Sequence, residues 1–283
     1  MAEIKLENVS FYHGKDTPYE IKALNSINIT IPHGMITGLI GHTGSGKSTL
    51  VQMFNGLLKP DEGRVLIDGK DIWEKSKDIR GVRFRVGLVM QYPEYQLFEE
   101  TIYKDIAFGP KNMGIPEAEL RERVEEAADF AGLERELLDR SPFDLSGGQK
   151  RRAAIAGIIA MRPEVLVLDE PAAGLDPRGR DQIFANIVEY QRKSGSTVVI
   201  VSHSMEDMAR LCDNLIVMAG GEIFMTGDRS TVFAEADKLT SVGLDVPQIT
   251  RLMSMLEDRG ISTQKGIYTV DGAFELLKNK FKV

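Results

Sequence analysis

A nine-residue stretch from Gly41 to Thr49 combines the residue types that hold phosphate groups. Its sequence, GHTGSGKST, follows the apolar run MITGLI and precedes the helix-like segment STLVQMFNGL. Glycines let the backbone curl so that its N–H groups surround phosphate oxygens, and the following helix adds its dipole. In such a loop the lysine reaches the β- and γ-phosphates and the serine ligates Mg²⁺. We therefore predict a phosphate-binding loop made of Gly41, His42, Thr43, Gly44, Ser45, Gly46, Lys47, Ser48 and Thr49.

Two adjacent carboxylates, Asp169 and Glu170, end the apolar run VLVL. Open α/β sheets bind their ligands at the carboxyl ends of the strands, so both side chains should face the phosphates. Asp169 can hold Mg²⁺ through water while Glu170 activates the attacking water. This pattern is weak alone, but together with the glycine-rich loop it predicts hydrolysis of a phosphoanhydride.

A second glycine-rich stretch reads LSGGQKRRAAIAGIIAMRPE. Ser146 and Gln149 have the spacing of a capping box, which opens a helix with Ile155, Ile158 and Ile159 on its inner side. A serine and two glycines at a helix N-terminus form a second anion site, so the chain would contact phosphate at two places. On its own, this stretch is better explained as an ordinary capped helix.

In the company of the first two motifs, the stretch resembles the signature motif of the ABC-transporter ATPases. Other marks of that family are present in the usual order. Gln91 matches the Q-loop glutamine, AGLDP (Ala173–Pro177) matches the D-loop, and His203 after the run TVVIVS matches the switch histidine. The resemblance extends from Ile4 to about Met225.

This resemblance implies ATP and Mg²⁺ as cofactors and a site shared between two subunits. In such ATPases two domains face each other head to tail, and ATP lies between one phosphate loop and the other signature. Glu170 would be the general base, and Gln91 and His203 would sense the γ-phosphate. The Mg²⁺ ligands would be Ser48, Gln91 and Asp169. The residues that reach the partner's site would be Ser146, Gly147, Gly148 and Gln149 of the signature and Asp176 of the D-loop.

The residue that stacks on adenine is left open. The family usually has an N-terminal aromatic residue in a pattern like Phe-x-Tyr. Here VSFYHG moves the tyrosine to Tyr12 and puts His13 in the expected place, so both are candidates and Tyr19 is a third. A second departure is Ala172, where threonine is more common.

The elements that must position these residues are short apolar runs alternating with helical patterns, which predict an α/β fold with a mostly parallel sheet. Hairpins are expected at Asp68-Gly69 and Gly220-Gly221. The resemblance implies an ABC-type P-loop nucleotide-binding domain with a RecA-like parallel core, an N-terminal antiparallel β subdomain and a helical signature subdomain. We expect this domain over residues 1–225, its helical subdomain over about 95–160, and a small C-terminal extension over 226–283. That extension either joins two ATPases or packs on its own domain.

Composition limits the possible partners. The 283 residues carry a net charge of −7, which offers no basic surface for nucleic acid, so no nucleic-acid partner is expected. The single cysteine, Cys212, suits a reducing cytoplasm. The N-terminus lacks a signal-peptide pattern, and no apolar run approaches the ~18 residues that span a bilayer.

The segment QYPEYQLFEETIYKDIAFGPKNMG resembles the same region of energy-coupling factor (ECF) ATPases, the vitamin- and metal-importing branch of the ABC family. The stretches GGQKRR and GHTGSGKST favour the second ATPase of the pair. Three partners are implied: a second ECF-type ATPase subunit, a transmembrane coupling subunit and an exchangeable substrate-binding membrane subunit. They would hold the chain at the cytoplasmic face of the cell membrane as a peripheral protein.

Residues 92–100, here called the docking loop, are predicted to receive the coupling subunit. The apolar and aromatic anchors would be Tyr92, Tyr95, Leu97 and Phe98. The acidic residues that would face a basic helix are Glu94, Glu99 and Glu100. The alternative is a surface loop whose aromatic side chains fold back onto the core.

Two other functions remain open, an ATPase of another ABC importer and a soluble ABC ATPase of DNA repair or translation. The latter usually carries coiled-coil insertions or tandem cassettes. A non-hydrolysing module would be expected to lack Glu170 or His203, and both are present. The transported substrate is not readable from this chain, because another subunit selects it, and the sequence leaves open whether the ATPase pair is a homodimer or a heterodimer.

Overall fold

The computed structural model describes residues 2–74, 79–261 and 266–281. Its centre is a six-stranded sheet in the order β10-β9-β3-β8-β7-β6. Five strands of this sheet are parallel: β3 (Ile36–Gly41), β6 (Val86–Val89), β7 (Val165–Asp169), β8 (Thr197–Val201) and β9 (Asn214–Ala219). The edge strand β10 (Glu222–Asp228) runs antiparallel to β9 after the predicted hairpin at Gly220-Gly221.

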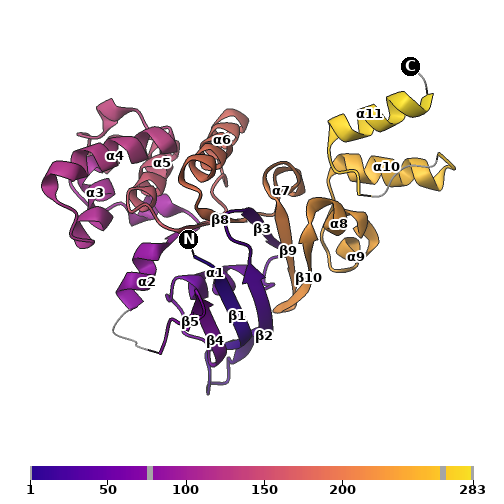
Figure 1. Ribbon diagram of the computed structural model, residues 1–283, viewed down its shortest axis with the longest axis horizontal. Coiled ribbons are helices and arrows are strands. Elements are labelled where there is room, and N and C mark those ends of the chain that lie inside the picture. Colours follow the sequence, from indigo (N-terminus) through magenta and orange to yellow (C-terminus); the bar gives the residue numbers. More distant parts are fainter. Residues whose placement is uncertain (1, 75–78, 262–265, 282–283) are drawn as a thin grey trace.

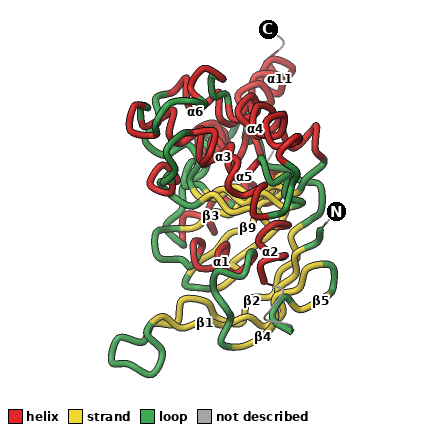
Figure 2. Tube along the Cα trace, turned by 90° about the vertical axis from the view of Figure 1, so that its left-hand side faces the viewer, coloured by secondary structure: helices red, strands yellow, loops and turns green. Residues whose placement is uncertain are grey.

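A smaller antiparallel sheet has the order β2-β1-β4-β5. Its strands are β1 (Ile4–His13), β2 (Ile21–Ile31), β4 (Glu62–Ile67) and β5 (Lys70–Asp71). The turn between β4 and β5 has positive φ at both Asp68 (53°) and Gly69 (74°), as a tight hairpin turn requires. Figure 1 shows this sheet below the parallel one, and Figure 2 shows α1 (Lys47–Phe54) lying between the two sheets.

The remaining helices form groups along the long axis of the molecule (Figure 1). One end carries α3 (Ile102–Asn112), α4 (Glu117–Ala131) and α5 (Gly147–Ile159), with α2 (Ile79–Arg85) below them. The middle carries α6 (Pro177–Ser194) and α7 (Met205–Leu211). The other end carries α8 (Arg229–Ala234), α9 (Ala236–Ser241), α10 (Gln248–Asp258) and α11 (Val270–Phe281). Short 3-10 turns are η2 (Pro93–Gln96), η3 (Arg135–Leu137) and η4 (Pro142–Asp144).

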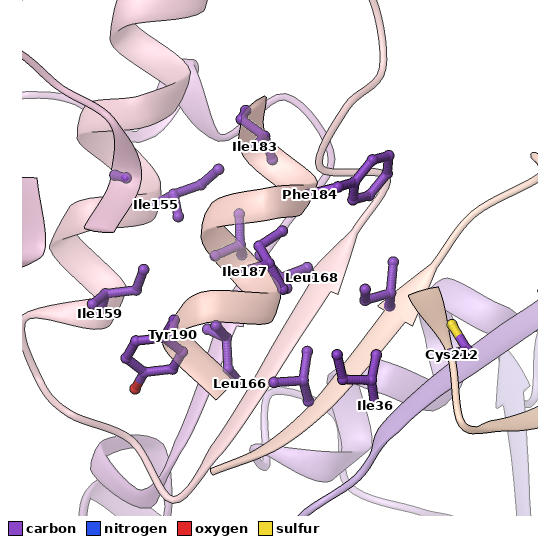
Figure 3. Close-up of a cluster of buried hydrophobic side chains, with 14 of the residues drawn as sticks. Ile36, Ile155, Ile159, Leu166, Leu168, Ile183, Phe184, Ile187, Tyr190 and Cys212 are labelled. Atoms are coloured by element: carbon purple, nitrogen blue, oxygen red, sulfur yellow. The ribbon is translucent and has the colours of Figure 1, made fainter. Parts of the chain in front are cut away.

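The parallel sheet is buried on both faces, which explains its continuous apolar strands. Successive side chains of a strand point to opposite faces, so β7 contributes to two clusters. Leu166 and Leu168 join α5 and α6 in one core, part of which Figure 3 shows. Val165 and Val167 join α1 and the antiparallel sheet in the other. The parallel strands are therefore held by apolar packing on both faces of the sheet.

The predicted architecture of two sheets and a helical group is confirmed. The helical group spans α3 to α5, residues 102–159. β10 continues to Asp228, so the last core strand runs three residues past the predicted boundary at 225. Within the described parts of the chain, no helix has the length and apolar character needed to cross a membrane.

Candidate functional site

The predicted phosphate-binding loop connects β3 to α1. Gly46 precedes the helix with a φ of 99°, and Gly44 has a φ of 81°, values that only glycine adopts without strain. A Cβ on Gly46 would lie 2.7 Å from the carbonyl oxygen of Ala23 on β2. The antiparallel sheet therefore presses directly on the loop, and the glycine allows the helix N-terminus to open toward a ligand.

Lys47 turns its ammonium group into this loop. Its Nζ donates hydrogen bonds to the carbonyl oxygens of Gly41 (2.6 Å) and His42 (2.9 Å). Burial lowers the pKa of Lys47, and the nearby Glu170 and Asp169 act in the opposite direction. The Lys47 ammonium group is thus partly desolvated at the position where a bound phosphate group would lie.

Ser48 and Asp169 come together although 121 residues separate them in the chain. The Ser48 hydroxyl donates to Asp169 Oδ2 over 2.9 Å, and Asp169 is buried at the end of β7. Burial raises the pKa of Asp169, as expected for a carboxylate in an apolar setting. In the described residues no group of three or more His, Cys, Asp or Glu could hold a metal. A hydroxyl and one carboxylate fit Mg²⁺, which takes few protein ligands and completes its shell with phosphate and water.

Glu170 and His203 form the next pair along the same edge. His203 Nδ1 lies 2.9 Å from Glu170 Oε1. Glu170 has a φ of 51°, a left-handed conformation rare for a non-glycine residue, and its N–H donates to Val201 O over 3.0 Å. Strain of this kind persists where surrounding structure holds a functional side chain in place. This conformation turns the carboxylate at the end of β7 toward His203, which follows β8.

Strand register explains why these residues and Gln91 share one edge. Val89 of β6 is opposite Leu168 of β7, and Asp169 is opposite Val201 of β8. Because β6, β7, β8 and β3 are parallel, their carboxyl ends meet. Gln91, two residues beyond β6, is exposed at that same edge.

The signature has the predicted capping box at the start of α5. Ser146 Oγ accepts from Gln149 N over 3.3 Å, and Ser146 N donates to Gln149 Oε1 over 2.9 Å. Gly147 is exposed, and nothing lies within 4 Å of where its Cβ would be. The D-loop residue Asp176 caps α6 by accepting from Gly179 N over 2.9 Å. The predicted trans roles of the signature and Asp176 stay predictions.

Of the three candidates for the adenine contact, Tyr19 is 84% exposed, while Tyr12 and His13 lie in different surroundings. His13 Nε2 is 3.2 Å from Thr49 Oγ1, so the ring at the end of β1 faces the phosphate-binding loop. The Tyr12 ring instead has the ammonium groups of Lys15 and Lys22 within 6 Å of its centre. Geometry favours His13, in the position where the family pattern has its tyrosine.

The docking loop differs from its prediction at two residues, Leu97 and Glu94. Tyr95 and Phe98 are 85% and 65% exposed, as expected of anchors, while Leu97 packs against the core. Glu94 was predicted to face a partner, and that was wrong: its carboxylate turns inward to Arg151 of α5, with an N–O distance of 2.8 Å. An unpaired buried guanidinium would cost more free energy than Glu94 would gain from hydration, so the carboxylate pairs with Arg151.

Sequence reasoning missed two arginines that join the motifs. Arg151 is only 4% exposed, and Arg180 of α6 donates to Ser204 and Asp207, which closely follow His203 in the chain. A signal for the first was present, because Arg151 precedes Ile155 by four residues and Ile159 by eight. An arginine in line with the apolar face of a helix requires a buried acid.

Fold and site together define an ATPase of the ABC type. A model of the family described as ABC transporter matches residues 24–173, and the chain belongs to this family. Within it the chain belongs to the ECF ATP-binding proteins. It is 53% identical over 272 residues to the "Energy-coupling factor transporter ATP-binding protein EcfA2" of Caldanaerobacter subterraneus, an alignment that covers 96% of this chain and 95% of the relative.

Solved structures agree with this placement. One is described as cbiO1 from Clostridium perfringens, part of the ABC transporter complex cbiONQ; it matches with a TM-score of 0.74 and 42% identity, covering 89% of this chain and 98% of its own. Another, a dimeric ATP-binding cassette MJ0796 bound to ADP and Pi, matches with a TM-score of 0.71 and 29% identity, covering 80% and 98%. The predictions of an ABC ATPase fold and of an ECF ATPase of the second type are confirmed.

Proposed function

We propose that this chain pairs head to tail with a second ECF-type ATPase subunit and closes around two ATP molecules. In its own half of a site, Glu170 would activate water while Gln91 and His203 contact the γ-phosphate. Ser48, Gln91 and Asp169 would hold Mg²⁺, which neutralises phosphate charge as it develops. The signature residues would complete the partner's site, so each subunit would contribute half of each site.

The observation that supports a shared site is the open signature. The hydrogen bonds of Ser146 and Gln149 stay within their own helix, and Gly147 faces open space. In the residues that the structure describes, no hydrogen bond joins the signature to the phosphate-binding loop. An uncovered anion site at a capped helix N-terminus is therefore available for the ATP of another chain.

We also propose that the docking loop receives a transmembrane coupling subunit, which with an exchangeable substrate-binding subunit would hold the chain at the cytoplasmic face. The exposed Tyr95 and Phe98 support this placement. Beside them lies a groove of about 340 Å³ whose lining includes Leu97, Phe108 and Ile158. Such a groove could take an apolar side of a helix, while Glu99 and Glu100 meet its basic residues. The imported cargo would be a vitamin or a transition-metal ion.

ATP-driven association tests the shared site. In Glu170→Gln, ATP should bind without turnover, so closed pairs should accumulate and the mass measured by light scattering should double. The matched control is Glu170→Gln with Ser146→Arg, which changes an exposed residue of the signature. The control should bind ATP equally well and stay unpaired. A Glu170→Gln protein that remains monomeric with ATP and the second ATPase present would contradict the proposal.

A further inference from the structure

Arg151 is a buried cation at the meeting point of three segments. It lies on α5, five residues after Ser146, and is 4% exposed. Its Nε donates to Glu94 Oε2 over 3.1 Å and its Nη2 donates to Glu94 Oε1 over 2.8 Å. Its Nη1 donates to the carbonyl oxygen of Ala173. One side chain on the signature helix thus holds both the docking loop and the start of the D-loop.

The Glu94 end of this link is tied to the Q-loop. Glu94 belongs to η2, and only Tyr92, with a φ of 58°, separates η2 from Gln91. Its carboxylate is 17% exposed and makes a two-pronged contact with the guanidinium. Such bidentate pairs fix direction as well as distance, unlike a lysine contact. A displacement of η2 would therefore move the guanidinium with it.

The Ala173 end is tied to the catalytic carboxylate. Ala173 N donates to Glu170 O over 3.1 Å, and Leu175 N donates to Ala172 O over 3.3 Å. These bonds form a short turn, 170–175, between the end of β7 and Asp176 at the start of α6. The turn is also held by the bond from Glu170 N to Val201 O of β8 and by packing of Ala172 and Leu175 against the core. Arg151 adds a side-chain hydrogen bond from a helix of another part of the fold.

We propose that Arg151 is a positioning residue that transmits movement of η2 to the turn 170–175 and so to the D-loop. A buried ion pair is weak evidence for stability, since apolar residues of similar volume often serve equally well. A fixed three-way geometry is instead suited to making two loops move together. That this movement originates in a membrane subunit rests on the proposed function; the mechanical link between the loops does not.

Hydrogen exchange of the isolated chain tests the link without any partner. Glu94→Gln keeps the side-chain shape but removes the charge that fixes Arg151. The amides of Ala173 and Leu175 should then exchange about two- to thirtyfold faster, the usual range for coupling between sites. Glu100→Gln is the matched control, because it alters an exposed pair with Lys104 in the same loop. Unchanged exchange at both amides in Glu94→Gln would overturn the proposal.

ATPase kinetics of the assembled transporter test the consequence of this link for turnover. Arg151→Lys keeps the charge but cannot make the two-pronged contact, so the KM for ATP should stay within about twofold while kcat falls about two- to thirtyfold. Combining it with Glu94→Gln should cost no more than the worse single change. Arg162→Lys, in an exposed pair with Glu126, is the control. Two results would refute the role of Arg151. One is a wild-type kcat in Arg151→Lys, and the other is a loss of ATP affinity and melting temperature as large as the loss of kcat. Absence of ATP-dependent uptake by the wild-type assembly would instead contradict the proposed function.

Discussion

Replacing Glu170 by glutamine isolates the chemistry of the general base. The amide has nearly the shape of the carboxylate, and its oxygen can still accept a hydrogen bond from His203 Nδ1, now 2.9 Å away. Glutamine has the same backbone cost at a φ of 51°, so the strand end should keep its conformation. The change therefore removes proton-accepting power while leaving ATP affinity and melting temperature close to those of the wild type.

The expected loss follows from the surroundings of the carboxylate. A positioned base contributes ~10²–10⁴ to a rate. The Glu170 side chain is only 14% exposed, so solvent replaces it poorly, and we expect the upper half of that range. A loss of ~10³–10⁴ corresponds to about 4–5.5 kcal/mol of activation free energy, at about 1.4 kcal/mol for each factor of ten.

Phosphate release by the ATPase pair at saturating MgATP measures this loss, and nucleotide titration measures the affinity. Glu189→Gln, in an exposed pair with Lys193 on α6, is the control and should leave turnover unchanged. Turnover by Glu170→Gln within tenfold of the wild-type value, with normal ATP affinity, would show that another group accepts the proton.

Burial raises the pKa of Asp169. From about pH 4, the pKa of the unfolded state, up to the raised pKa, the folded state binds more protons than the unfolded state, so the free energy of unfolding falls as pH rises through this range. Calorimetry without nucleotide should therefore show that Asp169→Asn melts higher than the wild type, by a margin larger at pH 7 than at pH 4, whereas Mg²⁺-dependent hydrolysis is lost. In ATP titrations His13→Ala should weaken affinity about tenfold, the scale of one base–aromatic stack, and Tyr12→Ala should have little effect; the reverse order would assign the adenine contact to Tyr12. Gly46→Ala should abolish ATP binding, since its Cβ would meet Ala23 O at 2.7 Å with φ at 99°; normal affinity would contradict this.

Local sequence determined the parts of this protein that depend on neighbours in the chain. Apolar runs marked the parallel strands, and Asp68-Gly69 marked a hairpin, because turn conformation depends on adjacent residues. The spacing of Ser146 and Gln149 predicted a capping box that the structure confirms. The order of the motifs was sufficient to identify the family, since each motif occupies consecutive residues.

Only the tertiary structure decided contacts between residues far apart in the chain. The bond from Ser48 to Asp169 and the pair of Glu170 with His203 depend on strand order and register, which no local pattern encodes. The inward turn of Glu94 had the same origin. The acidic residues around Glu94 predicted an exposed acidic surface. Arg151, 57 residues further along the chain, is buried on α5 and needs a carboxylate as its partner. An unpaired charge in the core costs more free energy than a carboxylate gains from hydration at the surface. The Glu94 carboxylate therefore packs inside, against Arg151.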